Sequence, residues 1–147
     1  MADDTEKVSV NMGAMDLAHI DLLVEKTFYK DRTDFFRTAA RNQIDKHSTV
    51  INSAIEELNS GVDLKRATFV WIGSYKLDKQ TILRMFDDDK EFTKIENGEL
   101  MFHSKLIVVG KLSVSDEVDL EFIRTFIKNI KVFGIFKAAN DIKKFFS

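Results

Sequence analysis

Residues 7–47 read KVSVNMGAMDLAHIDLLVEKTFYKDRTDFFRTAARNQIDKH. The first six alternate between polar and apolar side chains, with Val8, Val10 and Met12 at every second position, which predicts a short strand with one buried face. Apolar residues then recur every three or four positions, a spacing typical of an amphipathic helix over residues 15–28. The residues expected to face the interior from this helix include Leu17, Ile20 and Val24.

A second helix is predicted to begin at Asp31. Its carboxylate can accept hydrogen bonds from the free amides of the next turn, and Asp34 three residues later resembles the acidic end of a capping box. The apolar spacing resumes at Ile51 and reaches a typical stop at residues 59–61, Asn-Ser-Gly. Two alternatives stay open: one helix running to Leu58, or a break near residues 47–49, where no Gly or Pro forces an end. The apolar face at the start of this helix contains Phe35, Phe36, Ala39 and Ala40.

The second half of the chain has a different pattern, with β-branched and aromatic runs instead of helical spacing. We predict strands over residues 68–72, 106–109 and 131–136, and short helices over residues 79–86, 120–126 and 138–146. The predicted fold class is therefore α+β. We expect a first domain at 1–47, a helical linker at 48–66 and a mixed α/β domain at 67–147.

The second half also contains an internal echo. Residues 108–114 align with residues 132–138 at a shift of 24, and residues 71–77 could be a third, degraded copy because their glycine and alternate apolar positions coincide. One interpretation is a set of stacked strand-Gly-strand repeats. The alternative is chance similarity between short apolar strands, and the sequence leaves both open.

Composition excludes several classes of function. The chain has no Cys and three isolated histidines, His19, His47 and His103, so we expect no metal site and no cofactor. No nucleophile–base pair or phosphate-binding Gly loop is present, so we do not expect an enzyme. The acidic run Asp87-Asp88-Asp89 with Glu91 lacks the spacing of a calcium loop, and we expect a solvated turn there.

We also expect a soluble, cytoplasmic protein that does not bind membranes. No apolar run approaches the roughly 18 residues that span a bilayer, and the start MADDTEKVSV lacks the features of a signal peptide. The formal net charge is −2, from 22 Lys+Arg and 24 Asp+Glu, so any contact with DNA must be local. The sequence identifies no small-molecule ligand.

One short strand and two helices bury too little apolar surface to close a core, so residues 7–47 need a partner. Two copies of the strand would form an antiparallel ribbon with the four helices beneath it. The opposite ribbon face would present Lys7, Ser9 and Asn11 twice, and such a ribbon fits the major groove of DNA. The amides at the second helix start, near Arg32 and Thr33, would suit a phosphate, with Lys30 adding charge.

This stretch resembles a ribbon-helix-helix DNA-binding domain of the CopG/Arc/MetJ type, with residues 29–37, YKDRTDFFR, similar to its turn and second-helix signature. The longer pattern, with Asn42-Gln43 followed by His47, is similar to a subgroup of bacterial CopG-like regulators that carry an extra C-terminal domain. The resemblance implies an obligate homodimer with Lys7, Ser9 and Asn11 as base readers and Lys30, Arg32 and Thr33 as phosphate anchors. The residues expected in the dimer core are Val8, Val10, Met12, Leu17, Ile20, Val24, Phe35, Phe36, Ala39 and Ala40.

We therefore predict a sequence-specific transcriptional regulator, in the first instance a repressor, that binds double-stranded DNA as a homodimer and could extend to a tetramer. Residues 1–47 carry 7 Lys+Arg against 9 Asp+Glu, so we expect salt-sensitive binding strengthened by neighbouring dimers. Two alternatives stay open. The chain could be the antitoxin of a toxin–antitoxin pair, or a structural protein that assembles with itself and is anchored to DNA.

Overall fold

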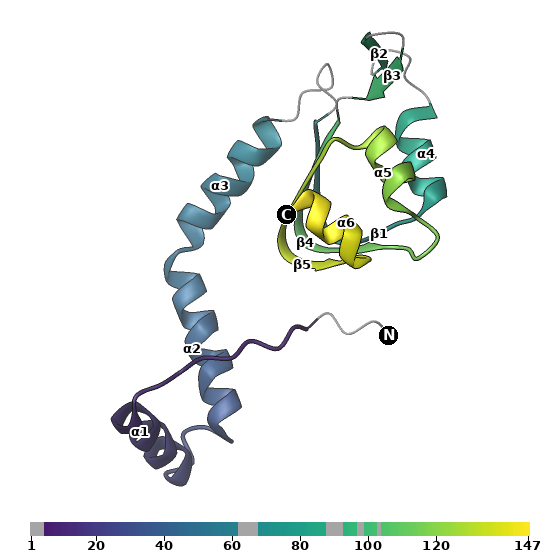
Figure 1. Ribbon diagram of the computed structural model, residues 1–147. Coiled ribbons are helices and arrows are strands. Elements are labelled where there is room, and N and C mark those ends of the chain that lie inside the picture. Colours follow the sequence, from purple (N-terminus) through teal and green to yellow (C-terminus); the bar gives the residue numbers. More distant parts are fainter. Residues whose placement is uncertain (1–4, 62–67, 88–92, 97–98, 103) are drawn as a thin grey trace. The chain divides into compact units, whose positions relative to one another are not determined.

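The computed structural model describes residues 5–61, 68–87, 93–96, 99–102 and 104–147 (Figure 1). The chain divides into two compact units. The N-terminal unit is Lys7–Glu57, and the C-terminal unit contains Leu58–Ser147. Helices and sheets occur together, which confirms the predicted α+β class.

The helix α1, Ala14–Glu25, ends three residues before the predicted position. Its last turn is closed by hydrogen bonds from the amide of Thr27 to the carbonyl of Val24 and from the amide of Phe28 to the carbonyl of Leu23. Thr27 has a φ of 64°, so the backbone turns left-handed there and leaves the helix. The predicted end at residue 28 was wrong because apolar spacing continues past this turn.

The helices α2, Arg32–Lys46, and α3, Ser48–Ser60, are separate. His47 stands between them with φ −106° and ψ 13°, and its carbonyl accepts from the amide of Ile51 in the next helix. This decides between the two alternatives in favour of a break. The predicted helix start at Asp31 and the stop after residue 60 are both confirmed.

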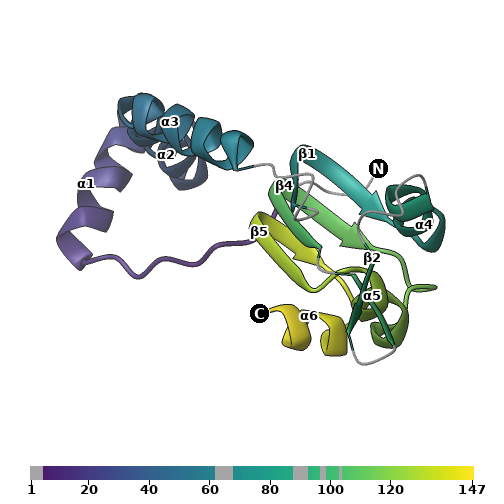
Figure 2. The same ribbon diagram turned by 90° about the horizontal axis from the view of Figure 1, so that it is seen from above.

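The C-terminal unit is built on three parallel strands in the spatial order β1-β4-β5 (Figure 2). Each strand is followed by a helix, and all predicted strands and helices of this half are confirmed in type, with longer strands and a later start for the last helix. The pairs are β1 (Thr68–Leu77) with α4 (Lys79–Asp87), β4 (Lys105–Val114) with α5 (Leu120–Phe126), and β5 (Asn129–Lys137) with α6 (Asn140–Phe146).

An antiparallel hairpin of β2, Thr93–Glu96, and β3, Glu99–Phe102, was not predicted. Its sequence signal is the Asn-Gly pair at positions 97–98, a pair typical of two-residue hairpin turns. The strands have only four residues each, too few for a clear alternation. The expected solvated turn at 87–91 and His103 fall largely or wholly outside the described residues.

Three glycines are register partners across the parallel sheet. Gly73 pairs with Gly110, and Gly110 pairs with Gly134. All three have φ between 125° and 135°, and a Cβ on Gly110 would lie 2.2 Å from the carbonyl oxygen of Gly73. The offset of 24 between β4 and β5 is the shift of the sequence echo, while the interpretation as stacked repeats stays a prediction.

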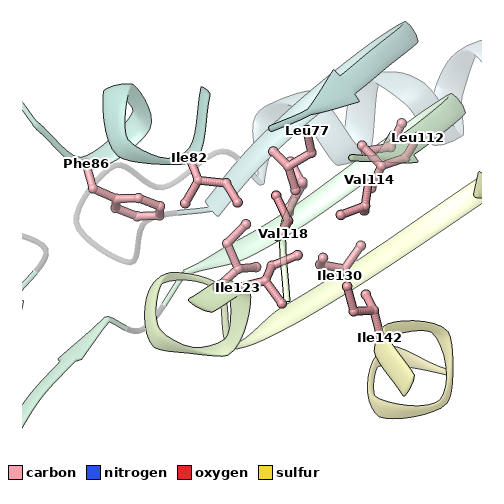
Figure 3. Packing of buried hydrophobic residues seen from close by; sticks show 12 residues of the cluster. Leu77, Ile82, Phe86, Leu112, Val114, Val118, Ile123, Ile130 and Ile142 are labelled. Carbon is pink, nitrogen blue, oxygen red and sulfur yellow. The ribbon is translucent and has the colours of Figure 1, made fainter. Parts of the chain in front are cut away.

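The core of the C-terminal unit lies between the sheet and its three helices (Figure 3). Leu112 and Val114 from β4 meet Ile82 of α4, Ile123 of α5 and Ile142 of α6 in one buried cluster. The N-terminal unit contributes nothing to that cluster and has one buried apolar residue among those described, Ile20. Within the described ranges, no helix combines the length and apolar character needed to cross a membrane.

Candidate nucleic-acid interface

The predicted base-reading residues lie on an exposed segment before α1. Lys7, Ser9 and Asn11 are exposed, and Val8 and Val10 between them are 80% and 66% exposed. No strand among the described residues of this chain pairs with the segment, so it is not a strand within one chain. The predicted strand is therefore not formed within a single chain, and its pairing with a second copy stays a prediction.

The turn before α2 is held by two acidic side chains. The Asp31 carboxylate accepts from the amide of Asp34 at 2.8 Å, and the Asp34 carboxylate accepts from the amide of Lys30 at 3.0 Å. The first of these bonds is the predicted N-cap. The second resembles the reciprocal hydrogen bond of a capping box, except that the Asp34 carboxylate binds the amide of Lys30, the residue before the N-cap. This bond fixes the backbone of Lys30 at the helix start.

Among the described residues, no group accepts from the amides of Arg32 and Thr33. They belong to the first turn of α2, where the helix itself offers no acceptor. Both side chains are exposed, as is that of Lys30. The structure thus brings the three predicted phosphate-binding residues together at one helix N-terminus, where the dipole favours an anion.

Sequence reasoning missed the residue that holds Arg32. Asp21 of α1 accepts from Arg32 Nε and from a terminal guanidinium nitrogen, both at 2.6 Å. These hydrogen bonds and the charge of Arg32 lower the pKa of Asp21 below its ordinary value. The two side chains are 54% and 51% exposed, so a competing anion can reach them.

The predicted dimer-core residues are mostly uncovered in one chain. Ile20 is 3% exposed, while Met12, Leu17, Val24 and Phe35 are half-buried. The Phe35 ring contacts Tyr29 edge-on at 5.0 Å and Phe36 at 5.6 Å between centroids. The exposed members are Val8, Val10, Phe36, Ala39 and Ala40.

Further apolar side chains are exposed beside them. Phe28 belongs to the predicted apolar spacing of residues 15–28, whereas Met15 and Leu22 were not predicted. Met15 is 68% exposed, Leu22 58%, and Phe28 73%. Met15 and Leu22 lie seven residues apart, about two helical turns, so their spacing could have identified them as members of one helix face. The N-terminal unit therefore presents a large uncovered apolar surface around the predicted strand and helices.

Among the described residues, no group of three or more His, Cys, Asp or Glu is arranged to hold a metal ion. His47 forms a hydrogen bond with Gln43 at 3.2 Å on the surface of α2. The candidate site is thus a set of exposed cations, amides and hydroxyls on and beside a helix start.

Comparison with known proteins supports this arrangement. A family model of ribbon-helix-helix transcriptional regulators matches residues 3–82, more than half of the chain. No curated protein and no solved structure gives a significant match. Regulators of this kind bind DNA, generally as dimers. From the exposed segment, the two helices, the capped turn and this match, we conclude that the chain belongs to the ribbon-helix-helix transcriptional regulator family.

Proposed function

We propose that this protein is a homodimeric repressor that reads operator DNA with a two-stranded ribbon. In this proposal the segments 7–12 of two chains pair antiparallel, and Lys7, Ser9 and Asn11 contact base edges in the major groove. Lys30, Arg32 and Thr33 hold phosphates at the N-terminus of α2. Repression follows when the protein occupies paired half-sites that a promoter needs free.

The observation that carries the proposal is the uncovered apolar surface of the N-terminal unit. Val8 is 80% exposed and Val10 66% exposed, and Ile20 is the one buried apolar residue described in Lys7–Glu57. A surface of this kind costs free energy in water unless something covers it. A second copy supplies matching apolar faces and, at the same time, the neighbouring strand that residues 7–12 lack.

In this proposal the C-terminal unit is a folded domain for oligomerisation or sensing. It has its own core, built from a three-stranded sheet and helices that follow each strand. The toxin-binding segments of antitoxins are usually polar and fold on binding. A segment with its own buried core does not need a toxin in order to fold, so we favour the repressor over the antitoxin.

The dimer can be tested with a single engineered thiol, because the chain has no Cys. Ser9 is the middle member of the three predicted base readers, so an antiparallel ribbon centred there places the two copies opposite each other, within disulfide distance. We expect the Ser9→Cys variant to form a covalent dimer under mild oxidation. The matched control is Ser53→Cys, on the exposed surface of α3. Equal cross-linking of both variants, or none with Ser9→Cys, would contradict the ribbon.

Sedimentation of the full chain and selection of bound duplexes from a random DNA pool complete the test. We expect a dimer at micromolar concentration and enrichment of two related half-sites in one duplex. A monomer that remains folded at working concentration would overturn the proposal, because one chain would then close its interior alone.

A further inference from the structure

The helices α4, α5 and α6 pack on one face of the parallel sheet, and the second face lies opposite them. The buried residues of β4 that pack in the core, Leu106, Val108, Leu112 and Val114, share one parity along the strand. Successive side chains of a strand point to opposite faces, so Ile107 and Val109 point away from the helices. We call this surface the outer face. It consists of Thr68, Val70, Ile72, Ser74, Lys76, Lys105, Ile107, Val109, Lys111, Ser113, Asn129, Lys131, Phe133, Ile135 and Lys137.

The centre of the outer face is apolar. Ile72, Val109 and Phe133 are register partners across the three strands and form one row. Neither Ile72 nor Phe133 packs in the core cluster, and their side chains are 47% and 45% exposed. Ile107, two residues before Val109 in β4, is only 6% exposed. The row therefore forms an apolar strip across the three strands.

The charge around this strip has a single sign. All five lysines of the three strands belong to the outer face by parity, and no Asp or Glu occurs in any of the three strands. Four of them, Lys76, Lys105, Lys131 and Lys137, are exposed, whereas Lys111 is buried at 7% exposure. The ammonium of Lys131 lies 5.0 Å from the centroid of the Phe133 ring, so charge and apolar surface are in direct contact.

We propose that the outer face binds an acidic segment of another polypeptide, one that carries apolar side chains among its carboxylates. The apolar residues of the segment would cover Ile72, Val109 and Phe133, and its carboxylates would face the exposed lysines, which are Lys76, Lys105, Lys131 and Lys137. A second copy of this face is a poor occupant, because lysines would then oppose lysines. The proposal is independent of DNA binding by the N-terminal unit.

Two other anionic partners fit the surface less well. DNA would find phosphate contacts at the rim, but an apolar strip of Ile, Val and Phe in the centre offers no hydrogen bonds to its backbone. A bilayer requires apolar side chains that reach beyond the lysines. The apolar surface instead combines the half-exposed Ile72 and Phe133 with the buried Ile107. Such a surface suits packing against the side chains of a polypeptide.

The test is selection of a random 12-residue peptide library, displayed on phage, against the full-length protein. We expect the enriched peptides to combine Asp or Glu with apolar residues. The affinity of the most enriched peptide is then measured by fluorescence anisotropy. The double variants Lys131→Glu/Lys137→Glu and Ile72→Ser/Phe133→Ser should each weaken it by about tenfold or more.

Matched controls lie on helices of the same unit. Leu83 of α4 and Phe145 of α6 are 47% and 49% exposed, so Leu83→Ser/Phe145→Ser removes similar apolar surface. Lys143→Glu/Lys144→Glu makes the same charge change on α6. We expect neither control to alter peptide affinity. Circular dichroism melting shows whether each variant is folded. If Lys131→Glu/Lys137→Glu does not fold, Lys131→Gln/Lys137→Gln, which removes the charges without reversing them, takes its place.

The proposal is overturned if no peptide is enriched, if the enriched peptides lack acidic residues, or if the controls weaken binding as much as the outer-face variants. Vesicles of phosphatidylcholine with phosphatidylserine, and a random DNA duplex, are tested with the same variants. Binding of either one that depends on the outer face, with no acidic peptide bound, would assign the surface to that partner and overturn the proposal.

Discussion

Arg32 at the start of α2 and Asp21 in α1 form a two-pronged ion pair, with both nitrogen–oxygen distances at 2.6 Å. The pair joins the two helices of the proposed DNA-binding unit across the turn between them. It also places a carboxylate beside the residue expected to hold a phosphate. A phosphate that binds Arg32 must compete with Asp21 for the same guanidinium group.

The first prediction concerns this competition. Asp21→Asn removes the negative charge and frees Arg32, so we expect tighter DNA binding and a dependence of log K on log salt that is steeper by about one. Arg32→Ala should weaken binding to all sequences alike. In the double variant the effect of Asp21→Asn should shrink, because its gain acts through Arg32. Fluorescence anisotropy over a range of salt concentrations measures all three.

Equal strengthening by Asp21→Asn with and without Arg32 would show that Asp21 acts only as a general negative charge near DNA. Asp45→Asn in α2 makes the same chemical change at an exposed position in the same unit. We expect it to have a smaller effect than Asp21→Asn.

The second prediction concerns pH. Hydrogen bonds from Arg32, together with its charge, lower the pKa of Asp21 in the folded protein. An unfolded aspartate titrates near a pKa of about 3.9. The stabilisation by the ion pair is therefore complete above that pH and is lost as the pH falls through the lower folded pKa. A carboxyl NMR titration should show this depressed pKa, and Arg32→Ala should raise it toward the ordinary value. An unchanged pKa in Arg32→Ala would contradict the pairing.

The third prediction concerns Thr27, which has a φ of 64° at the end of α1. A β-branched residue is strained in the left-handed region, where Gly is not. We expect Thr27→Gly to raise the free energy of unfolding by about 1 kcal/mol. The matched control is Thr38→Gly within α2, which should lower it because Gly disfavours a helix interior. Urea unfolding at one protein concentration measures both, and destabilisation by Thr27→Gly would contradict the strain.

The N-terminal helices show what sequence reasoning could reach. The start of α2 was predictable because Asp31 and Asp34 act within one turn, and the Asp31 carboxylate accepts from the amide of Asp34 as expected. The end of α1 was not, since it depends on the conformation of Thr27, a residue that rarely forms such turns. Asp21 was missed for a related reason. It meets Arg32, eleven residues later, only after this turn has set the direction of the chain.

The sheet shows a different limit. Strand positions followed from β-branched and aromatic runs, but strand order and register did not follow from any one strand. The similarity between residues 108–114 and 132–138 has a shift of 24 residues, and β4 pairs with β5 at the same offset, so the similarity already indicated the register of these two strands. The sequence alone could not distinguish that offset from chance similarity. The close approach at Gly110 gives the physical reason why glycine recurs at this position.

The fourth prediction ranks these glycines. A Cβ on Gly110 would lie 2.2 Å from the carbonyl oxygen of Gly73, whereas the nearest atom to a Cβ on Gly73 is 3.7 Å away. Both have positive φ, so Gly73→Ala should cost about 1–3 kcal/mol through backbone strain alone. Gly110→Ala should cost more, since neighbouring backbone must also move. Urea unfolding of the two variants tests the ranking, and equal losses would contradict it.

The fifth prediction separates base reading from phosphate binding in the proposed ribbon. Asn11 is exposed on the segment before α1, and its amide can donate to and accept from a base edge. Asn11→Ala should therefore reduce discrimination between a selected duplex and its scrambled form, by about 1–3 kcal/mol for a two-bond contact. Lys30→Ala should weaken both duplexes alike and reduce the salt slope by about one. If Asn11→Ala also weakened both duplexes alike, Asn11 would be a backbone contact and the ribbon would read sequence through Lys7 and Ser9 alone.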